Sequence, residues 1–397
     1  IIVIASGFVM MLSGSTFFYG LSAIFTSLLI DFNWSVASTS LAFSLRTEVQ
    51  GLTGPIIGLS IDKLGPKFTI IVGILIAGFA LFALSFINNL FQFYLVMLIS
   101  ALGIGAAGGQ VGMAAVATWF DKKRSRALSI MSVGGGISGA LVFLVAWLVE
   151  SYGWRTAVQI LSIYYIVAGL FFAFNIRSRP KDHHQPMDGV AKSLVNSEEN
   201  NIEGIRTKDA LKTKGFWSIA FATSFCLFAG VPIILLTIPF LESLGYSKTL
   251  ASIAMIAFTI STVIGRLGSG YLADKYSNKL ILTIGYLLVS FGTGALFFAN
   301  DIYMTMILLF ICGPGFGASI PIRASIIAEY FGTINFGTIN GFCVFVSTFG
   351  AVVGPWIVGK MVDVSGEYSY GWLVAGLIAF LAVPALIFAE KPSQMIK

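Results

Sequence analysis

Long apolar stretches separated by short polar ones dominate the pattern of the 397-residue chain. A helix that spans the hydrocarbon core of a bilayer needs about 20 mostly apolar residues. Twelve stretches are long enough, and we predict a membrane-spanning helix in each, which makes the fold an all-α membrane protein. The predicted spans are 1–30, 36–61, 68–87, 90–119, 127–149, 154–176, 215–241, 249–273, 280–299, 302–328, 337–359 and 371–389.

The only long polar segment lies between the sixth and seventh spans, at residues 177–214. Its two prolines, mixed charges and few apolar residues are typical of a flexible or lightly helical linker. It divides the chain into an N-terminal six-helix bundle (1–176), a cytoplasmic linker and a C-terminal six-helix bundle (215–397). The adjacent His183 and His184 lie in this linker without convergent Cys, Asp or Glu, so we assign them no metal.

The composition excludes most soluble functions. Hydrophobic residues make up 57% of the chain and charged residues only 11%, against about 25% charged in soluble domains. The three cysteines lie in apolar runs without CxxC spacing and suggest neither a disulfide framework nor a zinc site. No Walker-type loop or nucleophile–base pair is visible. We therefore expect no enzyme, metal or cofactor. Ile1 already lies inside an apolar stretch, so we expect further residues before it.

The basic residues sort by side of the membrane. If the N-terminus is cytoplasmic, eighteen of the 24 Lys and Arg lie on the inner side, three on the outer side and three within spans. Cytoplasmic loops carry such an excess of positive charge. We therefore predict a multi-pass protein of the inner (plasma) membrane with both termini cytoplasmic. The net charge of +6 is then a topology signal and does not indicate nucleic-acid binding. We expect a lipid-embedded monomer.

The two halves of the chain resemble each other. A shift of about 212 residues places Gly58–Lys63 on Gly270–Lys275 and Asn33–Ser35 on Gly245–Ser247. A slightly larger shift places Tyr152-Gly153-Trp154 on Tyr370-Gly371-Trp372, each before the last span of its half. Parallel repeats of this kind form one known plan of transporters, with the solute site at the membrane midplane between the halves.

Two motifs carry a resemblance to a known family. The run from Gly58 to Lys67 resembles the signature loop of the major facilitator superfamily, a Gly-x-Leu-Ala-Asp-Arg-x-Gly-Arg-Arg pattern. The run from Trp119 to Leu128, followed by glycines, is similar to the pattern of the monocarboxylate transporter family at its fifth span. That family's acidic-Gly-Gly-Trp element ahead of the first span is absent here. The resemblance covers the whole chain and implies twelve helices in two pseudo-symmetric bundles.

The signature loop and its copy predict a gating latch. Asp62 and Asp274 lie at cytoplasmic helix ends, where a carboxylate can pair with the N-terminus of a neighbouring helix. Gly58 and Gly270 allow helix backbones to approach closely. A charged, turn-forming loop without a gating role is the alternative. The predicted latch residues are Gly58, Asp62, Lys63, Gly65, Lys67, Gly270, Asp274 and Lys275.

Arg266 is the main candidate for binding a solute. It lies eight residues before Asp274, about 12 Å along a helix, so its charge cannot easily reach the inner surface. A charge within a span costs about 2.5–3.5 kcal/mol and is by default functional. The family resemblance implies an Arg on this helix that binds a carboxylate, with an Asp one turn earlier. Thr262 stands at that earlier position, so proton coupling through this pair stays open.

The repeat extends the predicted site to the second span. Gly54 aligns with Arg266, so the face of Gly54 should line the same cavity. Thr47 and Gln50 lie within about 40° of that face, and Arg46 flanks it at about 80°. Glu48 lies about 120° away, and both an interhelix contact and proton carrying stay open for it.

Further polar groups could complete the pocket. Arg323 lies near the cytoplasmic end of the tenth span, where solute contact and snorkelling to the surface are both open. Tyr19, Gln110 and Asn340 are the remaining polar candidates within spans.

These residues predict a secondary active transporter of a small organic anion, specifically a monocarboxylate, working by alternating access. Three cations lie within spans, and Arg matches the geometry of a carboxylate. Proton symport and anion exchange both stay open. The alternative is a proton-coupled drug or multisubstrate antiporter with Glu48 as the carrier, but the fifth span lacks the Gly-Pro element that such antiporters usually show.

Overall fold

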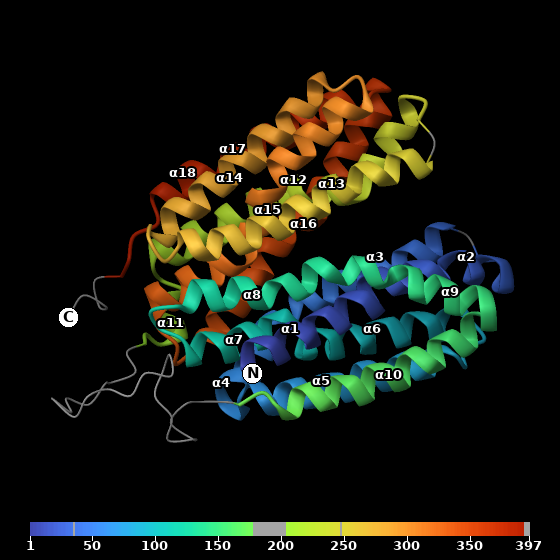
Figure 1. Ribbon diagram of the computed structural model, residues 1–397, viewed down its shortest axis with the longest axis horizontal. Coiled ribbons are helices and arrows are strands. Elements are labelled where there is room, and N and C mark those ends of the chain that lie inside the picture. The colour runs from blue at the N-terminus through green and yellow to red at the C-terminus, as the bar shows by residue number, and fades with distance from the viewer. Residues whose placement is uncertain (35, 178–203, 247, 393–397) are drawn as a thin grey trace. The chain divides into compact units, whose positions relative to one another are not determined.

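The computed structural model describes residues 1–34, 36–177, 204–246 and 248–392 (Figure 1). The all-α prediction is confirmed: helices joined by short connections make up the described residues, whose β-structure is a single bridge between Gly204 and Gly332. Most of the predicted linker, including His183 and His184, lies outside the described residues. Its described end carries one short helix, α11 (Thr207–Ala210).

Helices account for each of the first six predicted spans. In chain order they are α1 (Ile2–Ser13), η1 (Gly14–Gly20) and α2 (Leu21–Phe32); α3 (Val36–Leu52) and α4 (Gly54–Leu64); α5 (Pro66–Leu84); α6 (Leu90–Ala107) and α7 (Gly109–Trp119); α8 (Arg124–Ile137), η2 (Ser138–Leu141) and α9 (Val142–Tyr152); and α10 (Trp154–Phe174). Of these, η1 is a π-helix and η2 a 3₁₀-helix.

Longer helices form the last six spans. They are α12 (Lys214–Ser243), α13 (Lys248–Leu272), α14 (Asn278–Ala295) with η5 (Leu296–Phe298), α15 (Ile302–Phe331), α16 (Phe336–Ser365), and α17 (Tyr368–Phe380) with α18 (Ala382–Ile387). Within the described residues, nine helical stretches are long and apolar enough to cross a membrane. The three predicted spans outside this set, 1–30, 36–61 and 127–149, are each divided into shorter helices.

The chain forms two compact units. Unit 1 comprises residues 1–122, 130–200 and 336–341, and unit 2 comprises 123–129, 201–335 and 342–397. The first residues of α8 therefore belong to unit 2, although the rest of α8 belongs to unit 1. The first turn of α16 likewise belongs to unit 1, and its remainder belongs to unit 2.

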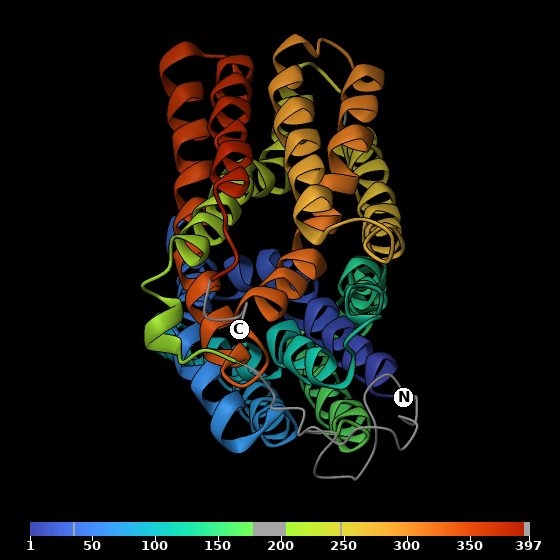
Figure 2. The same cartoon turned by 90° about the vertical axis from the view of Figure 1, so that its left-hand side faces the viewer.

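In unit 2 the helices run side by side, and α15 packs against both α13 and α14 (Figure 2). Glycines bring α13 and α15 into backbone contact: a Cβ atom on Gly317 would lie 2.1 Å from the Thr262 oxygen. A Cβ atom on Gly313 would lie 3.1 Å from the Phe258 oxygen. Residue numbers thus rise together along the contact, so the two helices are parallel. Small residues allow such close packing in a membrane protein.

Candidate functional site

Asp62 pairs with the N-terminus of α16 within unit 1. Its Oδ1 accepts a hydrogen bond from the Gly337 amide at 2.9 Å, and its Oδ2 accepts one from the Thr338 amide at 2.8 Å. The Thr338 hydroxyl also donates to Oδ2. The first amides of a helix have no partner within the helix and carry the positive end of its dipole. Asp62 therefore supplies both the acceptors and the charge that this helix end lacks.

The remaining residues of the first loop shape this contact. A Cβ atom on Gly58 would lie 2.2 Å from the Gly337 oxygen, so the close approach requires glycine. Gly65 has φ of 86° and turns the chain from α4 into α5. Lys67 donates a hydrogen bond to the Phe174 oxygen at the end of α10, whereas Lys63 is exposed.

The copy of this loop makes a different contact within unit 2. Asp274 Oδ2 lies 3.9 Å from Nη1 of Arg126, in the first turn of α8. The Arg126 guanidinium also lies 4.0 Å from the centre of the Tyr271 ring. A Cβ atom on Gly270 would lie 2.5 Å from the Ser129 side chain, and Lys275 is exposed. Asp274 therefore faces a side chain of its neighbouring helix.

Arg46 is buried in unit 1 and bound to a distorted helix. Its Nη1 donates a hydrogen bond of 2.6 Å to the Phe17 oxygen, which lies in the π-helix η1. Single-turn π-helical segments often occur at functional sites. The neighbouring Thr47 donates to the Phe43 oxygen at 3.1 Å and is exposed, while Glu48 and Gln50 are partly exposed.

The other predicted residues of unit 1 lie on three different helical segments. Asn340 is 1% exposed, and its Oδ1 has no hydrogen-bond partner among the described residues. Gln110 is partly exposed at the start of α7. Tyr19 belongs to η1, but its side chain lies outside the described set. Of these three residues, Asn340 is thus the buried one whose side-chain oxygen can still accept a hydrogen bond.

Unit 2 holds two buried arginines of the predicted site. Arg266 on α13 and Arg323 on α15 are each 7% exposed. Thr262, one turn before Arg266, is also buried, and its hydroxyl donates to the Thr259 oxygen at 2.8 Å. Both arginines are therefore deep within unit 2, on helices that pack against each other.

Sequence reasoning missed the surroundings of Arg323. The guanidinium lies within electrostatic range of the Cys226 and Cys343 thiols and the Tyr286 hydroxyl. The Thr223 and Tyr286 hydroxyls lie 3.2 Å apart. The cysteines gave no signal because each stands in an apolar run, where packing is the usual role.

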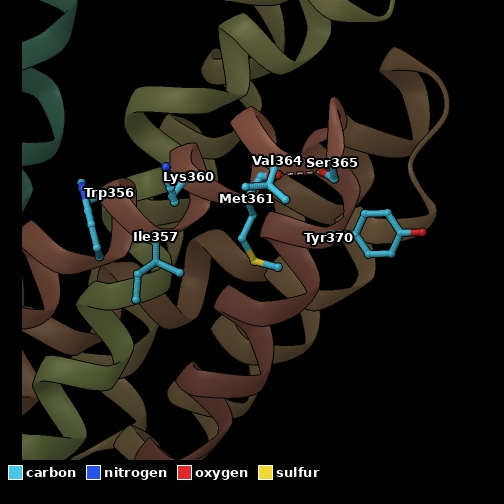
Figure 3. Close-up of a pocket in the computed structure, with 7 residues that line it drawn as sticks. All are labelled: Trp356, Ile357, Lys360, Met361, Val364, Ser365 and Tyr370. Carbon is cyan, nitrogen blue, oxygen red and sulfur yellow. Dashed lines mark hydrogen bonds between the residues drawn. The ribbon is translucent and has the colours of Figure 1, made fainter.

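A surface pocket lies away from these residues. It has a volume of about 260 Å³ and is formed by one face of α16 with Tyr370 of α17 (Figure 3). Its lining is Trp356, Ile357, Lys360, Met361, Val364, Ser365 and Tyr370. The lining is almost wholly apolar and includes none of the predicted site residues, so the buried arginines are better markers of an anion site than this pocket. Among the described residues, no group of three or more His, Cys, Asp or Glu could hold a metal ion.

Comparison with known proteins adds independent evidence. A profile described as Major Facilitator Superfamily matches residues 3–247 and 221–396. Monocarboxylate transporter 13 of Rattus norvegicus is 24% identical over 379 residues, which cover 93% of this chain and 83% of that protein. The Fujikurins efflux protein of Gibberella fujikuroi is 26% identical over 58% of this chain and 48% of its own. The structure of a proton:xylose symporter, XylE, superposes with a TM-score of 0.78 at 14% identity, covering 98% of this chain and 95% of that one.

Proposed function

Because the chain belongs to the Major Facilitator Superfamily, a family of multi-pass membrane transporters and not of enzymes, we propose that it moves a small organic anion by secondary active transport and alternating access. The observation that carries the proposal is the burial of Arg266 and Arg323 within two helices long and apolar enough to span a membrane, together with the burial of Arg46 on the shorter helix α3. A guanidinium attracts anions and matches the geometry of a carboxylate, so buried arginines favour an anionic solute.

Carboxylates are the anions that suit these residues best. A guanidinium binds a carboxylate through two parallel hydrogen bonds. Arg266 is the primary ligand in this proposal, with Thr262 as its polar neighbour one turn earlier on α13. The rat relative named for monocarboxylates supports that class. Proton symport and anion exchange are the two modes of coupling consistent with it.

The loop contacts support a gate, which the proposal places, together with both termini, on the cytoplasmic side of the plasma membrane. α16 belongs to unit 1 only through residues 336–341, and Asp62 holds that turn by its backbone amides. Release of these bonds would free the end of α16 from unit 1. Asp62 would thus act as a latch, with Asp274 and Arg126 as a weaker second contact.

An experiment on Arg266 tests the function. Protein reconstituted in liposomes should take up labelled lactate or pyruvate, and Arg266→Gln should lower that uptake at least tenfold. Arg266→Lys keeps the charge without the planar guanidinium, so its uptake should lie between that of the wild type and that of Arg266→Gln. Lys360→Gln removes a positive charge from an exposed position of unit 2 and serves as the matched control. Unchanged uptake by Arg266→Gln would exclude Arg266 as the ligand.

Drug–proton antiport is the second candidate, favoured by the similarity to a fungal efflux protein. Glu48 would then carry the proton, and its partly exposed position on α3 is compatible with that role. A strain that lacks its own drug pumps should then become resistant to lipophilic cations when it expresses this protein. The Glu48→Gln variant should not confer that resistance. Uptake of organic anions without any such resistance would reject this candidate.

A further inference from the structure

Four cations gather immediately before α12. They lie in residues 204–214, a stretch we call the basic segment, which includes α11 and ends where α12 begins. All four side chains are exposed, and Asp209 supplies the one carboxylate of this stretch, so its net charge is +3. The cations are Arg206, Lys208, Lys212 and Lys214.

The basic segment is fastened to unit 2 at both ends. The Ile205 amide donates a hydrogen bond to the Phe331 oxygen at 3.1 Å, and the Asn335 side chain donates one to the Ile205 oxygen at 3.0 Å. Farther along, the Trp217 indole donates to the Leu211 oxygen at 2.8 Å. The cations are therefore displayed on a backbone that is already ordered, which lowers the entropic cost of binding a partner.

An aromatic stripe continues from the basic segment along α12, which is long and apolar enough to span a membrane. The Trp217 and Phe221 side chains are 42% and 46% exposed, and their ring centres lie 5.5 Å apart. The Phe221 and Phe225 ring centres lie 6.5 Å apart. Residues spaced by three and four share one face of a helix, so Lys214 stands on the same face as the stripe and at its outer end.

This arrangement matches the layers of a membrane surface. Exposed aromatic rings on a spanning helix meet lipid, and tryptophan prefers the level of the headgroups, where its apolar ring and polar N–H are both satisfied. The cations precede the stripe and so reach the headgroup layer. The residues after α18 pack here too, because the Glu390 backbone contacts Gly215. Glu390 and the adjacent Lys391 carry opposite charges and leave the positive balance unchanged.

We infer that the basic segment and the stripe form a binding site for an anionic phospholipid, with the headgroup phosphate on the cations and an acyl chain along Trp217 and Phe221. A cluster of Lys and Arg beside a spanning helix attracts anionic lipid, and each cation contributes about a fivefold gain in affinity. The site lies apart from the buried arginines. The inference therefore goes beyond the proposed function and does not depend on the identity of the cargo.

Phospholipids with brominated acyl chains test the site, because bromine quenches an indole only when the two are in contact. The purified protein in detergent is titrated with brominated phosphatidylglycerol, which is anionic, or with brominated phosphatidylcholine, which is zwitterionic. Phosphatidylglycerol should reach half of its quenching at a concentration at least tenfold below that of phosphatidylcholine. Equal concentrations for the two lipids would overturn the inference.

Three variants locate the lipid. Lys212→Gln combined with Lys214→Gln should raise the half-quenching concentration of phosphatidylglycerol at least tenfold and leave that of phosphatidylcholine unchanged. Trp217→Phe keeps an aromatic ring but should remove the quenching seen at low phosphatidylglycerol concentration. If that quenching persists in Trp217→Phe, the lipid binds elsewhere and the inference is wrong.

Lys360→Gln is the matched control, since it removes an exposed cation at the far end of α16. Lys360 lies 25 residues, or about 38 Å along the helix, beyond Asn335, which contacts the basic segment. Both half-quenching concentrations should stay at their wild-type values. A loss as large as that of the double lysine variant would indicate diffuse surface charge and would reject a defined site.

Two measurements on the wild type keep the inference testable if the double variant fails to fold. Salt at 1 M screens exposed charges, so it should raise the half-quenching concentration of phosphatidylglycerol at least tenfold and leave that of phosphatidylcholine unchanged. Inorganic phosphate at a concentration equal to that of the lipid should not displace phosphatidylglycerol. Quenching that ignores salt, or full displacement by inorganic phosphate, would overturn the assignment to a lipid headgroup.

Discussion

The loop at Asp62 and its copy at Asp274 share a sequence pattern but hold their neighbouring helices differently. Asp62 accepts two backbone amides at 2.9 and 2.8 Å, whereas Asp274 lies 3.9 Å from a guanidinium whose side chain is 37% exposed. Hydrogen bonds to a charged group contribute about 1.5–3 kcal/mol each, while surface ion pairs contribute about 0–1 kcal/mol. The two copies of the pattern thus share the position of the carboxylate, but the atoms it meets set the strength of the contact.

The substitution with the largest expected effect is Asp62→Asn. The amide keeps one acceptor oxygen but loses the charge and turns an NH₂ group toward the amides of α16. We expect a loss of about 2 kcal/mol or more in the free energy of unfolding, since two charge-assisted bonds are weakened. Initial rates of uptake should fall at least tenfold if the contact is part of the gate. Thermal unfolding in detergent and uptake by proteoliposomes measure the two effects.

Asp62→Glu is the matched variant for this prediction, because it keeps the charge and moves it by one methylene. It should recover part of the transport rate. Wild-type rates and stability in Asp62→Asn would show that the amide contacts are dispensable.

A second pair of repeat copies sharpens the comparison. Trp154 donates its Nε1 hydrogen to Asp31 at 2.6 Å, whereas Nε1 of its counterpart Trp372 is enclosed without a partner among the described residues. The repeat places Ser243 where Asp31 stands in the first half, and the Ser243 hydroxyl bonds to the Phe240 oxygen instead. The second half therefore keeps the indole and lacks its acceptor.

This difference predicts that the same substitution has a larger effect in the first half than in the second. Trp154→Phe should destabilise the protein by about 1–2 kcal/mol, since it removes a hydrogen bond to a charged group. Trp372→Phe removes no hydrogen bond, so its effect should be smaller, with the loss of ring volume offset by the loss of a buried unpaired donor. Unfolding temperatures of the two variants, measured side by side, check the order. A larger loss for Trp372→Phe would contradict it.

The pattern of apolar stretches predicted every span but few of their ends. The eleventh span was expected to end at residue 359, where polar residues begin, yet α16 continues to Ser365. Hydropathy shows where the chain leaves the lipid. The helix itself ends where the backbone leaves the helical conformation, here at Gly366, whose φ is 75°. The divided helices were also missed. Pro232 and Pro314 lie inside continuous helices, while the π-helix at Gly14–Gly20 contains no proline.

The site was predictable only as a set of residue types. Burial of arginines follows from their place in apolar runs, and Asp62 was expected to pair with the N-terminus of a neighbouring helix. Which helix it meets depends on the contact between Gly58 and Gly337, 279 positions apart in the chain. The bond from Arg46 to the Phe17 oxygen depends on a local π-helix that sequence patterns do not reveal. Single-sequence reasoning supplies candidates, and long-range packing selects their partners.

Asp274→Asn should have the smallest effect and so completes the comparison of the two loops. Its ion pair with Arg126 is long and partly exposed, so we expect a loss of at most about 1 kcal/mol. High salt screens exposed charges, with a Debye length of about 3 Å at 1 M. The difference in unfolding temperature between the wild type and Asp274→Asn should therefore vanish at 1 M salt, while that of Asp62→Asn should persist. A salt-independent loss for Asp274→Asn as large as that for Asp62→Asn would mean that the two loops contribute equally after all.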